Sequence, residues 1–157
     1  MSQNFEQAME PVTRGISENY LGQMRSAAIG GGSFSAAIVL VLLQVGLSSV
    51  PLRISFYAAA LGIPVWIVVW QYVQPYLLYG PVSYNHFRKA HSIGVAAILA
   101  VLGLVSLTLS FTSLLWHMSL CVALVFVLLS VVAVVLILAH AQSVLAAVKW
   151  ADDRTGA

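Results

Sequence analysis

The feature that most limits the fold of this chain is a long stretch with almost no charge. From Ile54 to Val148 the only charged side chains are those of Arg88 and Lys89, which are neighbours in the sequence. Over the whole chain 8% of residues are charged and 61% are hydrophobic, whereas a soluble domain carries about 25% charged residues. A chain of 157 residues in water would still have to cover itself with polar surface. Lipid is therefore the expected solvent for most of the molecule.

Four apolar segments are long enough to cross a membrane, because each reaches the ~20 residues that span a hydrocarbon core of ~30 Å. They lack the alternation of period two that is typical of barrel strands. The sequence therefore predicts an all-α membrane protein, with a four-transmembrane-helix bundle over residues 27–148 and a cytoplasmic tail over 149–157. The four spans are expected at about 27–46, 54–78, 92–115 and 118–148.

The basic residues are distributed unevenly between the two sides of these spans. One side carries Arg53 alone. The other side carries Arg14, Arg25, Arg88, Lys89, Lys149 and Arg154. Because Lys and Arg accumulate on the cytoplasmic side, we expect both termini in the cytoplasm, and the compact loops favour a bacterial inner membrane. Arg88 and Lys89 are expected to hold their loop at the cytoplasmic interface, within reach of lipid phosphates.

Residues 1–26 are predicted to form a short amphipathic helix in the cytoplasm. Apolar residues recur there at intervals of three or four, namely Phe5, Met9, Val12, Ile16, Tyr20 and Met24. Two arginines and three glutamates give this segment a local net charge of 2 − 3 = −1. A helix that binds anionic lipid is normally basic, so docking on protein is the expectation and a solvated, frayed segment is the alternative.

Small residues recur along one face of the first and third spans. The overlapping motifs of the first span are Ala28-xxx-Gly32-xxx-Ala36 and Ala27-xxx-Gly31-xxx-Ser35. The third span repeats Ala96, Gly103 and Ser110 at a spacing of seven. Small residues let helix backbones approach closely in lipid. The candidate contact residues are Gly31, Gly32, Ser35, Ala36 and Gly103, and the patterns leave open whether they pack within the chain, against another membrane protein or against a second copy.

The fourth span carries His140 on a track of small and weakly polar residues that also includes Ser130. Such a track is typical of a helix-packing face, and an ionisable side chain inside a membrane is a functional candidate. We expect His140 to hydrogen-bond a neighbouring helix. The alternative is a b-type haem held by His140 and His91, although ideal helix geometry turns His91 away from the small-residue face of its span. His86 and His91 are five residues apart, whereas metal ligands on one helix face are three or four apart.

The absence of acidic residues between Glu18 and Asp152 bears on function. Ion-coupled transporters usually place carboxylates in the membrane, and membrane enzymes need a nucleophile with its base or metal-binding acids. No such set is recognisable, so neither an enzyme nor a coupled transporter is expected, and no cofactor apart from the haem alternative. The net charge of +2 gives no indication of nucleic-acid binding.

Two classes of non-enzymatic membrane protein remain. The favoured class acts through helix–helix contacts, as an accessory subunit of a membrane complex or as an immunity-type protein against a membrane-acting toxin. The alternative is an oligomeric pore or passive carrier, for which the polar lining is thin. That lining would consist of Gln44, Gln71, Gln74, Ser106, Ser110 and Ser130. The expected partners are membrane lipid and either another membrane protein or a second copy of the chain.

Overall fold

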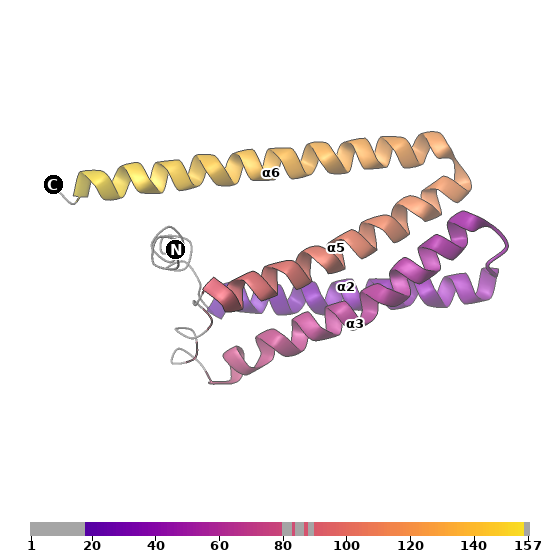
Figure 1. Ribbon diagram of the computed structural model, residues 1–157, viewed down its shortest axis with the longest axis horizontal. Helices are drawn as coiled ribbons and strands as arrows, with labels where there is room; N and C mark the ends of the chain where they lie inside the picture. Colours follow the sequence, from indigo (N-terminus) through magenta and orange to yellow (C-terminus); the bar gives the residue numbers. More distant parts are fainter. Residues whose placement is uncertain (1–17, 80–82, 84–86, 88–89, 156–157) are drawn as a thin grey trace. The chain divides into compact units, whose positions relative to one another are not determined.

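The computed structural model describes residues 18–79, 83, 87 and 90–155, and within these ranges the regular structure is helical (Figure 1). The four long helices are α2 (Glu18–Val45), α3 (Val50–Tyr79), α5 (Ala90–Met118) and α6 (Leu120–Thr155). Each contains a segment long and apolar enough to cross a membrane. The predicted all-α fold with four membrane-length helices is therefore confirmed. The predicted N-terminal amphipathic helix lies largely outside the described residues.

Two helices are longer than the apolar segments that predicted them. α2 begins at Glu18 rather than near residue 27, because the intervening residues include good helix formers such as Gln23, Met24 and Arg25. α6 has 36 residues and extends ~54 Å at 1.5 Å per residue, against a hydrocarbon core of ~30 Å. An apolar segment of membrane length, Leu120–Ser143, lies within α6.

The connections between α2 and α3 and between α5 and α6 are short. α2 ends where Gly46 adopts a φ of +87° and donates its N–H to the Leu42 carbonyl at 2.9 Å, a conformation that glycine reaches without strain. Arg53 then donates from Nε to the Leu47 carbonyl at 3.1 Å. Between α5 and α6 a single residue, Ser119, accepts a hydrogen bond from the Ala123 N–H at 3.1 Å.

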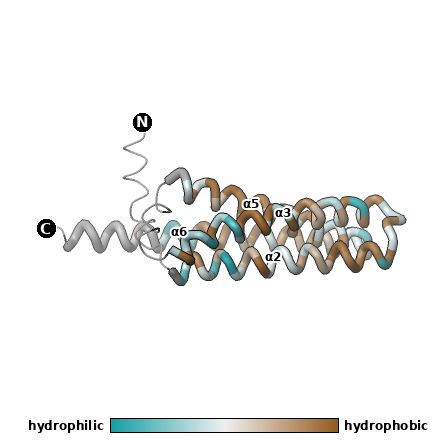
Figure 2. The backbone as a smooth tube through the Cα atoms, turned by 90° about the horizontal axis from the view of Figure 1, so that it is seen from below, coloured by the Kyte–Doolittle hydropathy of each residue, from teal (hydrophilic) through white to brown (hydrophobic). Residues whose placement is uncertain are grey.

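The chain divides into two compact units, residues 1–114 and 115–157. In the first unit, α2, α3 and α5 enclose three apolar clusters that follow one another along α3. The fully buried members of these clusters include Leu21, Leu42, Ala59, Val73 and Phe87. Hydrophobic residues cover most of the length of the helices, and hydrophilic residues gather near their ends (Figure 2). This distribution is the one expected for helices that face lipid over their middle portions.

α3 carries two prolines within the helix, Pro64 and Pro75. Each removes the N–H that would bond to the carbonyl four residues earlier. The helix nevertheless continues from Val50 to Tyr79, as membrane helices commonly do through proline. Pro64 is exposed while Trp66, two residues later, is buried, so the proline faces away from the side of α3 that packs in the core.

Candidate helix-contact site

The first site is a tryptophan ring held between two glycines from different helices. A Cβ atom built on Gly103 of α5 would lie 2.8 Å from Trp66 Cε2 and 2.9 Å from Cζ2. A Cβ on Gly31 of α2 would overlap the same region of the ring, at Cε2, Cδ2 and Cζ2. The backbones of α2 and α5 would collide if both approached these ring atoms from the same side. Gly31 and Gly103 therefore lie on opposite faces of the indole ring. Trp66 thus joins α2, α3 and α5 in one contact.

A second close approach lies one helical turn from Trp66, at Gly62 of α3. A Cβ on Gly62 would meet the Ser35 hydroxyl oxygen of α2 at 3.2 Å and the Ser106 Cβ of α5 at 3.5 Å. Gly62 is buried and Ser35 has no exposed surface. The spacing of four residues between Gly62 and Trp66, and between Gly31 and Ser35, places both contacts on one face of each helix. Together they make a three-helix junction, the Trp66 junction, formed by Gly31, Ser35, Gly62, Trp66, Gly103 and Ser106.

The Trp66 junction is stabilised by packing rather than by hydrogen bonds. Within the described residues, the Trp66 indole N–H and the Ser35 hydroxyl are buried and have no hydrogen-bond partner. Leaving a buried polar group unpaired costs ~1–3 kcal/mol. The close contact of ring and backbone must offset that cost, since dispersion is the main attraction between helices in lipid. The junction therefore holds three helices together through van der Waals contact.

A hydrogen-bonded contact between α3 and α5 lies farther along the same unit. Ser110 Oγ donates to the Ser55 carbonyl at 3.0 Å, and the two hydroxyl oxygens are 2.9 Å apart. Since the Ser110 proton is used on the carbonyl, the Ser55 hydroxyl donates to Ser110 Oγ. Both serines are fully buried, so each hydroxyl is satisfied inside the protein. Phe34 of α2 stacks on Phe111 of α5 with ring centroids 5.7 Å apart.

The structure brings several of the predicted contact residues together within the chain. Gly31 and Gly103 share Trp66, Ser35 packs at Gly62, and a Cβ on Gly32 would lie 3.4 Å from Trp66 Cβ. Ala36 is half-buried. Of the alternatives that the sequence leaves open, packing within the chain is thus observed for Gly31, Gly32, Ser35 and Gly103, and contact with a partner stays a prediction.

Trp66 is not among the predicted contact residues, although the sequence contains a signal for it. Small-residue motifs identify a face that a neighbour can approach but do not name the neighbour. Two glycine-containing faces leave room for one large side chain. Trp66 stands at the centre of the predicted span 54–78, as Gly103 does in the predicted span 92–115.

The predicted residues of α6 belong to the second unit. Ser130 is half-buried and donates its hydroxyl to the Phe126 carbonyl at 2.8 Å, so this hydroxyl is satisfied within the helix. His140 is exposed, as are all residues from 131 to 143. Arg88, Lys89 and His86 lie outside the described residues, as does the side chain of His91. The interfacial role of the basic pair and the haem alternative therefore stay predictions. Among the described residues, no group of three or more His, Cys, Asp or Glu side chains could hold a metal ion.

Comparisons with known proteins do not indicate a family for this chain. No protein-family model, curated protein or solved structure matches this chain.

Proposed function

We propose that this protein is a non-enzymatic membrane protein that acts through helix–helix contacts, as an accessory subunit of a larger membrane complex. The proposal places the partner-binding surface on α6, at the track that contains Ser130, Ala133, Ile137 and His140. The small-residue faces of α2 and α5 contribute less to this surface in the proposal, because the Trp66 junction already occupies them.

The observation that supports the proposal most is that α6 has no helical neighbour within its own unit. The described part of the unit 115–157 contains no second helix of comparable length, so residues 131–143 have no packing partner inside that unit. Small residues such as Ala133 would let a partner backbone approach closely. An imidazole in an apolar environment is stabilised by a hydrogen-bond partner, which a neighbouring helix can supply to His140.

The burial of Ser110 also favours this proposal over an oligomeric pore. Ser110 would belong to the polar lining of such a pore, but its hydroxyl is buried against Ser55. A pore lining needs polar groups that face the conducted ion or solute. We therefore expect no conductance when the purified protein is reconstituted in a planar bilayer.

The test compares two substitutions that place leucines on opposite faces of α6. Ala133→Leu enlarges a side chain on the small-residue track, and Val135→Leu does so about 160° away, at 100° per residue. Tagged variants are purified from native membranes at matched expression, and co-purifying membrane proteins are quantified, with chemical cross-linking to detect a second copy. We expect Ala133→Leu to lose the partner several-fold and Val135→Leu to retain it. Equal recovery with both variants, or no membrane protein or second copy bound to the wild type, would contradict the proposal.

A further inference from the structure

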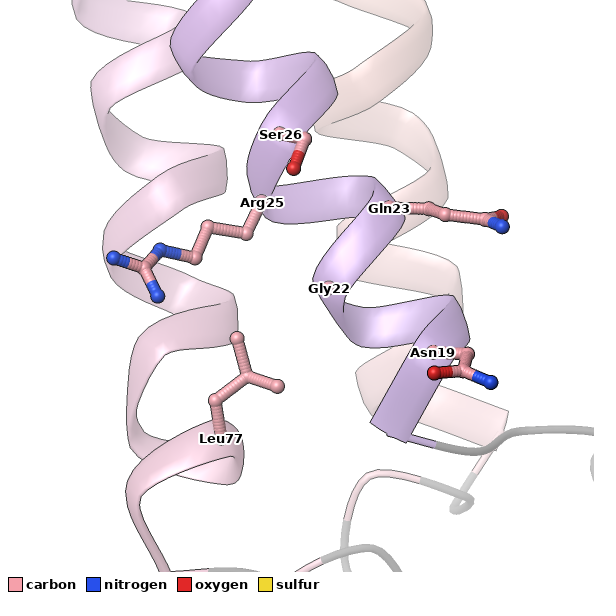
Figure 3. Close-up of a pocket in the computed structure, with 6 residues that line it drawn as sticks. All are labelled: Asn19, Gly22, Gln23, Arg25, Ser26 and Leu77. Atoms are coloured by element: carbon pink, nitrogen blue, oxygen red, sulfur yellow. The ribbon is translucent and has the colours of Figure 1, made fainter.

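A polar groove lies near the N-terminal end of α2, apart from the contacts described above. It has a volume of about 770 Å³, and among the described residues its lining comes from α2 and from one residue of α3. The residues that line it are Asn19, Gly22, Gln23, Arg25, Ser26 and Leu77. Figure 3 shows how these side chains lie around α2.

The floor at the centre of the groove is a glycine, Gly22, and polar side chains lie on both sides of it. At 100° per residue, Gly22 and Ser26 lie near the centre of a face of α2, with Arg25 to one side and Asn19 and Gln23 to the other. Figure 3 shows this division, since the Arg25 side chain extends toward Leu77 while both amides point the opposite way. A Cβ on Gly22 would meet nothing within 4 Å. The floor is therefore open enough to receive a headgroup-sized ligand.

The charge of Arg25 is uncompensated within the described residues. Arg25 is exposed, and no ion pair involving it occurs among the residues that the structure describes. It lies within the membrane-length segment Asn19–Val45, ~9 Å along the axis from Asn19 at 1.5 Å per residue. A guanidinium at the edge of the hydrocarbon is stabilised by an anion that accepts its paired N–H groups, and a phosphate does so with two hydrogen bonds.

We propose that this groove binds the phosphate of an anionic phospholipid such as phosphatidylglycerol. Arg25 holds the phosphate, the Ser26 hydroxyl donates to one of its oxygens, and Asn19 and Gln23 bond the headgroup hydroxyls across the Gly22 floor. A zwitterionic lipid would bring its ammonium group toward the guanidinium, so the site favours a headgroup without a cation. This inference is independent of the partner proposed for α6.

The position of Arg25 explains why the net charge of the N-terminal segment is misleading. Averaged over residues 1–26, the charge is negative and argues against anionic lipid. In the structure Arg25 belongs to the membrane-length helix α2 and not to a separate segment. Its own surroundings, rather than the average, decide which ligand it attracts.

The test uses full-length, delipidated protein in detergent, with bound lipid counted by native mass spectrometry during titration with phosphatidylglycerol or phosphatidylethanolamine. Arg25→Gln removes the charge, and Gly22→Leu fills the floor while the charge remains. The matched controls are Arg53→Gln, which removes an exposed arginine near the other end of the first unit, and Gly30→Leu, where a Cβ likewise meets nothing within 4 Å. Circular dichroism verifies the helix content of each variant.

We expect Arg25→Gln to weaken phosphatidylglycerol binding at least ~10-fold, as the loss of a charge-assisted hydrogen-bonded pair implies. Gly22→Leu should weaken it comparably, Arg25→Lys should weaken it less, and both controls should bind as the wild type does. Inorganic phosphate at millimolar concentration should not displace the lipid. Unchanged binding by Arg25→Gln or Gly22→Leu, an equal loss with either control, or full displacement by inorganic phosphate would overturn the lipid site.

Discussion

The Trp66 junction predicts that adding one methyl group to Gly103 destabilises the fold. In Gly103→Ala the new Cβ would lie 2.8 Å from Trp66 Cε2, whereas carbon atoms in contact prefer about 3.5–4.0 Å. The ring cannot retreat, because Gly31 occupies its other face. The backbone of α5 must shift instead, and overpacking of this kind costs ~1–3 kcal/mol.

Gly94→Ala on the same helix is the matched control. A Cβ there would meet nothing within 4 Å, and alanine favours a helix interior over glycine by about 0.5–1 kcal/mol. We therefore expect the two substitutions to change the free energy of unfolding in opposite directions. The measurement is reversible unfolding in mixed micelles, followed by circular dichroism.

A double-mutant cycle tests whether the cost comes from the ring itself. In a Trp66→Leu background the space beside Gly103 is no longer blocked by an indole, so Gly103→Ala should cost less there than in the wild type. The expected coupling free energy exceeds about 0.5 kcal/mol, the level at which independent sites cease to be additive. Equal stability of Gly103→Ala and Gly94→Ala, or a cycle without coupling, would refute the proposed contact.

Three further predictions concern the remaining contacts. Ser110→Ala should lower the free energy of unfolding by ~0.6 kcal/mol and at most ~1.7 kcal/mol, the range for interhelical hydrogen bonds in membranes. A cycle with Ser55→Ala should recover as coupling only the part due to the bond between the two hydroxyls, because the Ser55 carbonyl that accepts from Ser110 remains. His140→Ala should weaken partner binding by about 0.6 kcal/mol in the co-purification assay. If this variant binds the partner as the wild type does, His140 is not part of the proposed partner-binding surface. His86→Ala and His91→Ala should leave both fold and partner binding intact, and loss of binding with His91→Ala would instead support the haem alternative.

The positions of the helices can be predicted because hydropathy reports directly on the solvent that each segment needs. The interior of every predicted span lies within one of the four helices. Hydropathy places the start of α2 near residue 27 instead of at Glu18, because the first turns of this helix are polar and hydropathy detects apolar segments rather than the ends of helices. The same limit applies to the C-terminal part of α6, whose helix extends to Thr155.

From the sequence, the candidate contacts can be predicted only as the helix faces that take part in them, and not as pairs of contacting residues. The motifs around Gly31 and Gly103 indicate close approach, but a motif within one helix contains no information about which residue of another helix enters the gap. Trp66 becomes identifiable once the register between α2, α3 and α5 is known. The groove at Gly22 and Arg25 escapes sequence reasoning for a related reason, since it depends on the direction of single side chains around α2.

The most direct test of the account is the membrane topology, because the proposed function requires helices that cross a bilayer, and the basic residues predict both termini in the cytoplasm. Single cysteines are introduced at Ser2, Ser49, Asn85 and Thr155 after Cys121 has been replaced, and intact cells are treated with a membrane-impermeant thiol reagent. The account predicts labelling at position 49 alone, with positions 2, 85 and 155 labelled only after the membrane is permeabilised. Labelling at position 85 in intact cells would contradict it.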